Sequence, residues 1–460
     1  MSIFKKHKKD EENIQIQKQE QNEEITDTSN HILMGERDVF SLKDNKDDVV
    51  VVGKLQGTVH IGDAVYLTNV GEDEEALFLT TICGIETGPS ISVKEATDCN
   101  VALILEKGRH FRIKKGSVLF SRDCLTKDVR TTYTNTLGDV FVGEKNLDIS
   151  DQEYAVLSIA DCAEIWRLYI WFQSKVKKEE PNPKDEKIEK LREVLCKKLM
   201  NAESIHCVFS KLTGEPHMFS RTINQKNGSY MCMAPYILLG TKQYMDSLMT
   251  SLPKEKYEIR KIENGADRKG IYNFLGSTFY LNGACGVSVQ ADHMMIPDKM
   301  LVPKPDYSNM KPQNVPVTNP DLVRWLLLIG QLGKPENAEA EIVYKLYYRF
   351  MSKELTKANL LVPMQCEGEI PKGDAEGKTV LQKDTQIKIV TMNGKYDRPA
   401  VRMYTDWKRL RMVYGDEWNG LIQKVSGMIA VYDCAINVTQ YVQAGCYVSK
   451  ECYEEMEKME

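Results

Sequence analysis

The sequence lacks the long apolar runs that anchor a protein in a bilayer. No run approaches the roughly 20 apolar residues that a membrane-spanning helix needs, and the charged N-terminus has none of the apolar core of a secretory signal. Ser2 stands where N-myristoylation requires glycine. Hydrophobic residues at 42% and charged residues at 28% are typical of an ordinary soluble globular protein. We therefore expect a cytoplasmic protein without a membrane span.

Metal and catalytic signatures are missing as well. The 12 cysteines are scattered and form no Cys-x-x-Cys pair, and the seven histidines give no His-Glu-x-x-His. Scattered free cysteines in a reducing compartment are most simply small buried apolar residues. No Gly-x-Ser-x-Gly nucleophile turn occurs. The sequence predicts no metal site, no cofactor and no catalytic residue, and hence a protein that is not an enzyme.

A phosphate-binding loop for nucleotides is also lacking. Such a loop needs Gly-x-x-x-x-Gly-Lys-Ser/Thr between a strand and a helix. The nearest match, Gly373 to Thr379, is one residue too short and lies between two strand-like runs. Asn45-Lys46-Asp47-Asp48 spells a guanine-recognition tetrapeptide, but polar turns commonly have this composition. We expect neither GTP binding nor GTP hydrolysis.

What is present suggests several domains, since 460 residues correspond to about two to four domains. Residues 1–34 are polar and are predicted to be a disordered tail. Residues 35–125 contain short β-rich runs separated by glycine turns, the pattern of an antiparallel barrel or sandwich. Residues 126–184 form a predicted helical connector in which Asp148 or Ser150 can cap a helix. A further helix is predicted from Lys187 to Met200.

The β-rich region resembles domain 2 of elongation factor Tu over about residues 38 to 122. The resemblance rests on Val49-Val-Val-Val-Gly-Lys-Leu, on Gly57-Thr-Val-His-Ile-Gly-Asp-Ala-Val-Tyr and on Ala96-Thr-Asp-Cys-Asn-Val-Ala-Leu-Ile-Leu. It implies a β-barrel, which in that family lies beside a GTPase domain and contacts tRNA ends or ribosomal RNA. No GTPase domain is expected here.

The resemblance also implies candidate RNA contacts. Phe40, Glu86 and Asn100 keep the residue types of the family's pocket for the tRNA end, whereas Val52 and Gly88 depart from them. A basic cluster that follows could contact phosphates. Its members are Lys107, Arg109, His110, Arg112, Lys114 and Lys115.

The remainder of the chain contains a weak internal repeat. In both copies a Pro and a Thr stand six residues apart around an alternating strand: Pro235 with Thr241, and Pro399 with Thr405. Each Thr is predicted to cap a following helix, and Asp406, which precedes Trp407, adds favourable charge at the helix start. The predicted fold is two α/β domains with mixed sheets.

The repeat also aligns other segments. It pairs the strand Ile205 to Leu212 with Ile387 to Met392, and it pairs Gly286-Val-Ser-Val with Ile436-Asn-Val-Thr. The short helices Pro297 to Leu301 and Ser449 to Met456 follow these last runs.

Residues 315 to 458 resemble the SseB family, the enhanced serine sensitivity protein B group. The resemblance rests on Leu360-Leu-Val-Pro and on the later turn Tyr404-Thr-Asp-Trp. It implies an SseB-like α/β domain at 315–460, a more diverged copy at 185–303 and a linker at 304–314. The family brings no established enzymatic chemistry.

The leading hypothesis from the sequence is a non-enzymatic cytoplasmic adaptor, in which a translation-factor-type barrel is tethered to two SseB-like domains that bind a protein partner. The alternative is an RNA- or ribosome-associated accessory factor that uses the barrel. An enzyme of amino-acid metabolism is a third class, suggested only by the SseB family's name.

Overall fold

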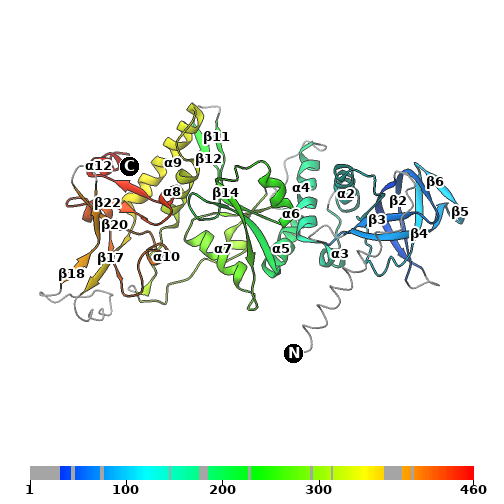
Figure 1. The fold of residues 1–460 in the computed structure, drawn as a ribbon, viewed down its shortest axis with the longest axis horizontal. Coiled ribbons are helices and arrows are strands. Elements are labelled where there is room, and N and C mark those ends of the chain that lie inside the picture. Colours follow the sequence, from blue (N-terminus) through cyan, green and yellow to red (C-terminus); the bar gives the residue numbers. More distant parts are fainter. Residues whose placement is uncertain are drawn as a thin grey trace. The chain divides into compact units, whose positions relative to one another are not determined.

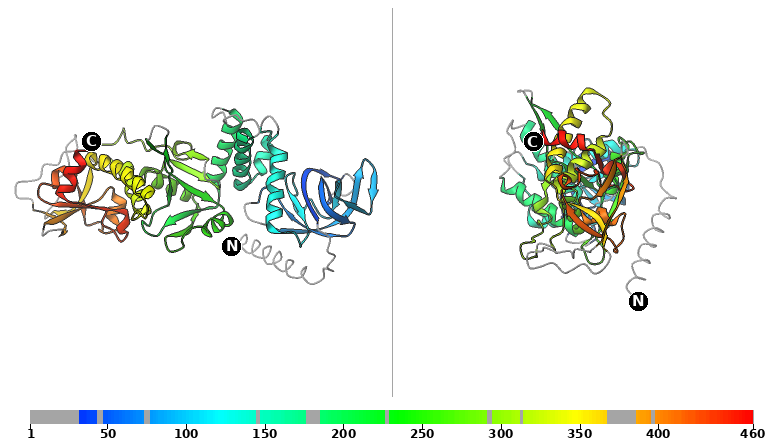
Figure 2. Two further views of the ribbon diagram at one scale, coloured as in Figure 1. Left: turned by 90° about the horizontal axis from the view of Figure 1, so that it is seen from above. Right: turned by 90° about the vertical axis from the view of Figure 1, so that its left-hand side faces the viewer.

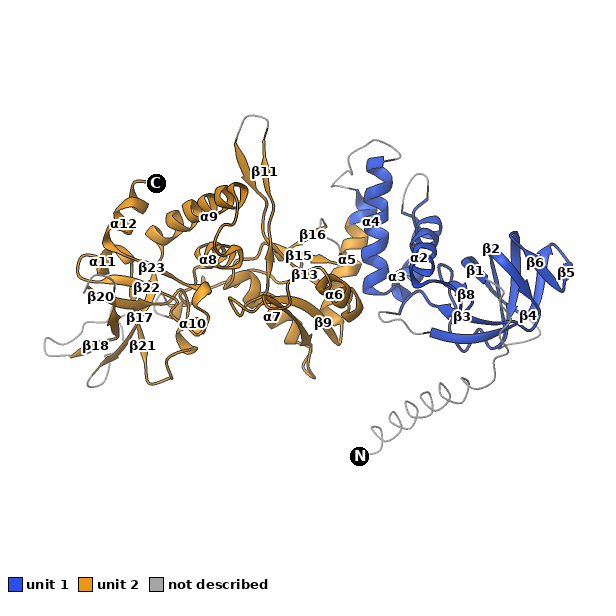
Figure 3. Cartoon of the chain, turned by 45° about the horizontal axis from the view of Figure 1, so that its top comes forward, with its two compact units in different colours: residues 1–188 blue, residues 189–460 orange. Residues whose placement is uncertain are grey.

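The structure is a computed structural model of the chain. It describes residues 32–42, 47–72, 77–143, 147–175, 185–225, 229–290, 294–311, 314–366, 386–394 and 398–459. Residues 1–31 of the predicted disordered tail, the segment from Gly373 to Thr379, and Asn45 and Lys46 lie outside the described residues. The chain divides into two compact units, Met1–Ile188 and Glu189–Glu460, which Figure 3 colours separately.

Unit 1 begins with a closed barrel of six antiparallel strands. In pairing order they are β1 (Ile32–Ser41), β8 (Val118–Phe120), β3 (Ala64–Thr68), β4 (Leu77–Gly88), β7 (Asn100–Leu105) and β2 (Val49–His60), and pairing of β2 with β1 closes the ring. The short strands β5 (Ile91–Val93) and β6 (Glu95–Thr97) pair with β4 and β2. The strands curve around one core in Figures 1 and 2. The barrel predicted from the sequence is confirmed.

The barrel core follows from the two-residue period of its strands. On β2, Val49, Val51 and Leu55 are buried, whereas Val50 and Val52 between them are partly exposed. Alternating side chains of a strand point to opposite faces, so one set fills the barrel and the other faces outward.

In the described part of unit 1 the barrel is followed by α2 (Thr126–Phe141), α3 (Asp151–Val156) and α4 (Ile159–Lys175). Ser150, one of the two residues predicted to cap a helix here, caps α3 in a reciprocal capping box with Glu153. The buried carboxylate of Asp161 accepts the N–H of Gly71 at 2.8 Å and the hydroxyl of Tyr133. The turn after β3 is therefore tied to the helices by a satisfied buried acid.

Unit 2 contains two mixed sheets, reached through α5 (Glu186–Asn201). The first sheet has the order β14 (Tyr257–Glu263), β9 (Ser204–Ser210), β13 (Tyr236–Gly240), β15 (Gly286–Val289) and β16 (Met295–Pro297), with β10 (Met218–Phe219) beside β13. Its helices are α6 (Lys242–Met249) and α7 (Gly270–Tyr280), followed by the 3-10 turn η1 (Asp298–Met300).

The second sheet joins two smaller ones. β18 (Ile387–Ile389), β17 (Leu360–Cys366) and β21 (Asn419–Gln423) form one, and β19 (Thr391–Asn393), β20 (Pro399–Met403), β22 (Asp433–Ile436) and β23 (Cys446–Val448) form the other. A bridge between Leu361 and Tyr404 connects β17 to the end of β20. The accompanying helices are α8 (Pro320–Leu332), α9 (Ala338–Lys357), α10 (Trp407–Arg411), α11 (Val425–Met428), η4 (Val442–Ala444) and α12 (Lys450–Glu457).

The two sheets have the same strand order and directions. β14-β9-β13-β15-β16 corresponds to β21-β17-β20-β22-β23, with the third and fourth strands parallel and the others antiparallel in both. The duplication in the sequence therefore has a counterpart in the topology.

Three details of the sequence alignment were wrong. The topology shows that the element of the second copy equivalent to β9 is β17, not the strand-like run beginning at Ile387. In the same way, the residue equivalent to Gly286 is Asp433, not Ile436. The cap differs too: Thr241 accepts the N–H of Tyr244 and caps α6, but α10 is capped by the next residue, Asp406. Helix α10 begins one residue later because Thr405 is engaged elsewhere.

A separate ribbon of β11 (Thr222–Asn224) and β12 (Tyr230–Cys232) stands away from the sheets of unit 2 in Figures 1 and 3. Among the helices that the structure describes, none has the length and apolar character to cross a membrane.

Candidate functional site

The three residues that match the translation-factor pocket lie on one outward-facing wall of the barrel. Phe40 on β1, Val50 on β2 and Ile104 on β7 form one cross-strand row. Glu86 on β4 and Asn100 on β7 point to the same outward side, in the next two rows. The register therefore brings Phe40 and Asn100 onto one wall although they are 60 positions apart in the sequence.

Phe40 is the most accessible apolar group of this wall, with 51% of its surface exposed. The residues between it and the two polar ones, Val50, Val52, Ala102 and Ile104, are partly buried. The wall is thus a shallow apolar surface with an aromatic ring at one end and polar side chains at the other.

The basic cluster splits into two groups. Lys107, Arg109, His110 and Arg112 are exposed on the loop after β7. The guanidinium of Arg109 donates to the Ser41 hydroxyl at 3.1 Å, which places this loop beside the residue that follows Phe40.

Two acids hold the backbone of this loop. The N–H of Lys107 donates to the Asp48 carboxylate at 2.9 Å, and the N–H of Arg109 donates to the Asp47 carbonyl at 2.9 Å. Lys107 and Arg112 have φ of 52° and 53°, in the left-handed region that non-glycine residues seldom adopt. The anchored backbone keeps the basic side chains on the outside of the turn.

The second group, Lys114 and Lys115, points elsewhere. Lys114 donates to the carbonyl of Val70, and Lys115 forms an ion pair with Glu153. The hydrogen bonds from Lys115 and Ser150 hold the pKa of Glu153 below its ordinary value, although burial opposes them. Lys114 therefore holds the turn after β3, Lys115 connects the barrel to α3, and neither extends the exposed group.

Sequence reasoning missed Glu36, a fully buried carboxyl group in the barrel. It lies on the same side of β1 as the core residues Ile32 and Met34, and neither carboxylate oxygen has a hydrogen-bond partner among the described residues. Burial raises its pKa well above the usual value, because a low-dielectric core disfavours the charged form.

The predicted repeat residues have separate positions in unit 2. Pro399 is the first residue of β20 and Pro235 directly precedes β13. Trp407 opens α10, and its ring lies 5.0 Å from the guanidinium of Arg411. Thr241 caps α6 and also accepts a hydrogen bond from Gln290 at 3.0 Å. These residues shape the ends of the strands.

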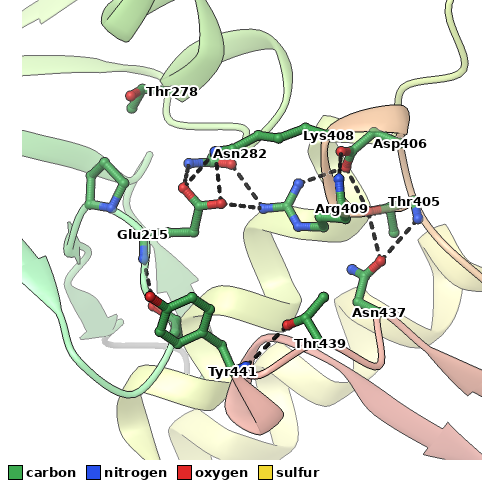
Figure 4. A network of polar contacts seen from close by, with 12 residues as sticks. Glu215, Thr278, Asn282, Thr405, Asp406, Lys408, Arg409, Asn437, Thr439 and Tyr441 are labelled. Atoms are coloured by element: carbon green, nitrogen blue, oxygen red, sulfur yellow. Dashed lines mark hydrogen bonds and ion pairs between the residues drawn. The ribbon is translucent and has the colours of Figure 1, made fainter. Parts of the chain in front are cut away.

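Thr405 and Asp406 belong to a buried polar network (Figure 4). The Thr405 hydroxyl donates to Asp406 at 2.8 Å, and the Thr405 N–H donates to Asn437 at 3.0 Å. Asp406 in turn receives the guanidinium of Arg409 at 2.6 Å. Asn437 corresponds to Gln290, since each directly follows the parallel strand and has φ of 53°. The hydrogen bond differs, because Gln290 donates to Thr241 whereas Asn437 accepts from Thr405.

The network joins the two sheets of unit 2 through Glu215, which lies on the loop after β9. Arg409, only 2% exposed, also donates to Glu215 at 3.3 Å and to Asn282 at 2.9 Å. Lys408 contacts both oxygens of Glu215, at 2.9 and 3.0 Å. In Figure 4 the Glu215 carboxylate faces Asn282, Lys408 and Arg409. Two acids and two bases are thereby balanced in a nearly buried contact.

A small cavity of about 10 Å³ adjoins the network, lined by residues that include Thr213, Glu215, Arg409 and Asn437. The side-chain nitrogen of Asn437 is buried and has no partner among the described residues. This volume holds about one water molecule. The network is therefore a filled structural contact without room for a substrate.

No group of three or more His, Cys, Asp or Glu side chains is arranged to hold a metal ion in the part of the chain that the structure describes. No family model matches the sequence, and comparison with curated proteins gives no match either. The SseB resemblance therefore stays a prediction.

Among solved structures, the chain is weakly similar to the apo form of translation elongation factor SelB from Methanococcus maripaludis. The identity is 24%, the match covers 25% of this chain and 24% of that chain, and the TM-score is 0.18. This chain thus matches about a quarter of that factor's length.

Proposed function

We propose that this protein is a non-enzymatic accessory factor that binds RNA through its barrel. The observation that supports the proposal is the position of the exposed Phe40 ring beside the exposed basic loop. Proteins that bind single-stranded nucleic acid combine such a ring, on which a base stacks, with cations that contact the phosphates. The basic side chains of the loop are Lys107, Arg109, His110 and Arg112.

The formal net charge of -5 limits what kind of binding to expect. Because the basic group is small and local, its electrostatic attraction for RNA is modest and sensitive to salt. The aromatic ring should then contribute a large share of the affinity. Binding should be clearest for an unpaired strand, whose bases are free to stack.

Replacing Phe40 with Ala should weaken binding of a short single-stranded RNA by about 5- to 150-fold, because stacking contributes about 1–3 kcal/mol per base. Replacing Arg109 with Ala should instead reduce the slope of log K against log salt by about 0.7, the value for one phosphate contact with a single strand. Fluorescence anisotropy of a labelled oligonucleotide at several salt concentrations measures both effects.

Leu77→Ala is the matched control, since Leu77 is also an exposed apolar residue of the barrel, on β4. It should leave binding unchanged. Equal affinities of the wild type and the Phe40→Ala variant, or no binding by the wild type at low salt, would reject the proposal.

A second candidate function, that of a protein-binding adaptor, is favoured by the ribbon of β11 and β12. Ile223 and Met231 are cross-strand neighbours, and both are more than 40% exposed, as is Met233 beyond them. Cross-strand neighbours share one face of a ribbon, so these side chains form an exposed apolar patch.

The adaptor candidate predicts that replacing the three patch residues with Ser removes the proteins that co-purify with the tagged full-length chain. A control with Val431 and Val442 replaced by Ser, both exposed apolar residues of unit 2, should retain them. Quantitative mass spectrometry of the purified material makes the comparison. The same set of proteins in all three samples would exclude the ribbon as the adaptor surface.

A further inference from the structure

A polar pocket of about 410 Å³ lies in unit 1 between the barrel and α2. Its charged lining comes from three segments: Arg37 on β1, Lys115 in the turn before β8, and Asp139 in the last turn of α2. Val140 completes the lining. Two cations and one acid thus line the pocket, and each cation has an acid partner: Arg37 pairs with Asp139 and Lys115 pairs with Glu153.

A β-bulge turns Arg37 toward this pocket. Glu36 is opposite Gly53 on β2 and Asp38 is opposite Val52, so Arg37 is the extra residue of the bulge. The Glu36 backbone donates to the carbonyl of Ser117 at 2.8 Å and accepts the N–H of Gly116 at 2.7 Å. These two bonds hold the turn that carries Lys115 next to the bulge.

Both cations are accessible to an anion. The guanidinium of Arg37 contacts Asp139 at 3.1 Å, but both side chains are 58% exposed, and exposed ion pairs contribute little to stability. Lys115 is fixed by Glu153 and lies 5.6 Å from the centre of the Phe141 ring, yet more than a third of its side chain stays exposed. A phosphate group also accepts bidentate bonds from arginine, so it can compete with the single carboxylate for the guanidinium.

We propose that this pocket binds a phosphate group, and that in the RNA complex it holds a backbone phosphate of the strand whose base stacks on Phe40. The second part rests on the proposed function. Arg37 and Phe40 are three residues apart on β1, about 10 Å along an extended strand. A single RNA strand can therefore reach both.

The test uses the full-length chain and two probes, a labelled single-stranded RNA of about ten nucleotides and inorganic phosphate. Arg37→Ala should lower the salt slope for the RNA by about 0.7 and abolish the stabilisation by phosphate in thermal unfolding. Asp139→Asn removes the competing acid and should tighten both ligands about two- to fivefold, the range for an exposed ion pair.

Arg167→Ala and Glu164→Gln are the matched controls, because this Arg–Glu pair on α4 is also partly exposed and belongs to the same unit. Both should leave the two probes unaffected. A purely structural role is the competing explanation: α2 has no basic residue in its last turn, so Arg37 also offsets the negative helix end. That role alone would lower the thermal stability of Arg37→Ala without changing phosphate or RNA binding.

The outcomes separate the two proposals. RNA binding that depends on Phe40 but ignores Arg37 and Asp139 would overturn the pocket and leave the proposed function standing. Phosphate binding that depends on Arg37, with no RNA binding, would support the pocket and reject RNA as the source of the phosphate. A wild type that binds neither probe would overturn both.

Discussion

Replacing Arg409 with Met should destabilise unit 2 by about 3–5 kcal/mol, the usual cost of removing one partner from a buried ion pair. The variant leaves Asp406 without its cation and leaves Glu215 with Lys408 and the amide of Asn282. Urea unfolding of the full chain, followed by hydrogen exchange of peptides from β20 and β22, measures the loss where it occurs.

Methionine is the informative replacement at this position. Methionine is unbranched and apolar, so it keeps much of the aliphatic packing of the arginine side chain without its charge. The loss of stability therefore reports mainly on charge. Arg411→Met is the control, since Arg411 is about one-third exposed and its loss should cost about 1 kcal/mol or less. Similar losses of stability in Arg409→Met and Arg411→Met would contradict the assignment of Arg409 to a buried ion pair.

A combined variant separates the unpaired charges from the lost contacts. Adding Asp406→Asn and Glu215→Gln to Arg409→Met neutralises both acids that lose the arginine in the single variant. Neutral replacement of a buried ionic cluster is often tolerated far better than removal of one member. The triple variant should therefore recover part of the stability, and this non-additivity is expected for side chains in direct contact.

The sequence predicted the barrel because its signal is local. The β-branched run Val49 to Val52 and the turn glycines specify strands without reference to distant residues. The family resemblance named Phe40, Glu86 and Asn100, but their outward position follows from the strand register of the structure. What the sequence did not supply is the loop contact between Arg109 and Ser41, which are 68 residues apart.

The buried network could not be predicted in the same way. Glu215 and Arg409 are 194 residues apart, and a Lys-Arg pair on a short helix is ordinarily solvated. The helix start was placed one residue early because a Thr-Asp sequence offers two caps, and only the contact of Thr405 with Asn437 excludes the first.

Lowering the pH from about 6.5 to 4 should cost unit 2 stability through His217. This side chain is packed edge-on against Phe219 and Tyr257, with ring centres 4.6 and 4.8 Å away. Its Nδ1 has no hydrogen-bond partner among the described residues. Burial lowers its pKa from 6.5 to about 4, because no nearby group compensates the charged imidazolium.

The direction of the effect follows from proton uptake by the two states. Above pH 6.5 the imidazole is neutral in both the folded and the unfolded chain, so it adds no pH dependence. Between 6.5 and 4 the unfolded chain binds a proton that the folded chain excludes, and unfolding becomes more favourable by about 3 kcal/mol over this window. His217→Phe keeps an aromatic ring but cannot titrate, so its stability should fall less steeply.

The measurement is the difference in urea midpoint between wild type and His217→Phe at pH 7.5, 6, 5 and 4. The contributions of the carboxylates are common to both chains and therefore cancel in this difference. The difference should shift in favour of the variant as the pH falls, whatever the offset at pH 7.5. His110→Phe, at an exposed histidine of the barrel loop, should show no such shift.

Protonation of His217 should also loosen the loop that carries Glu215. His217 is two residues from Glu215, and its backbone N–H donates to the carbonyl of Val208 on β9 at 2.8 Å. Hydrogen exchange at pH 5 should therefore increase in the segment around Glu215 in the wild type and not in His217→Phe, and parallel pH profiles of the two chains would refute this account of His217.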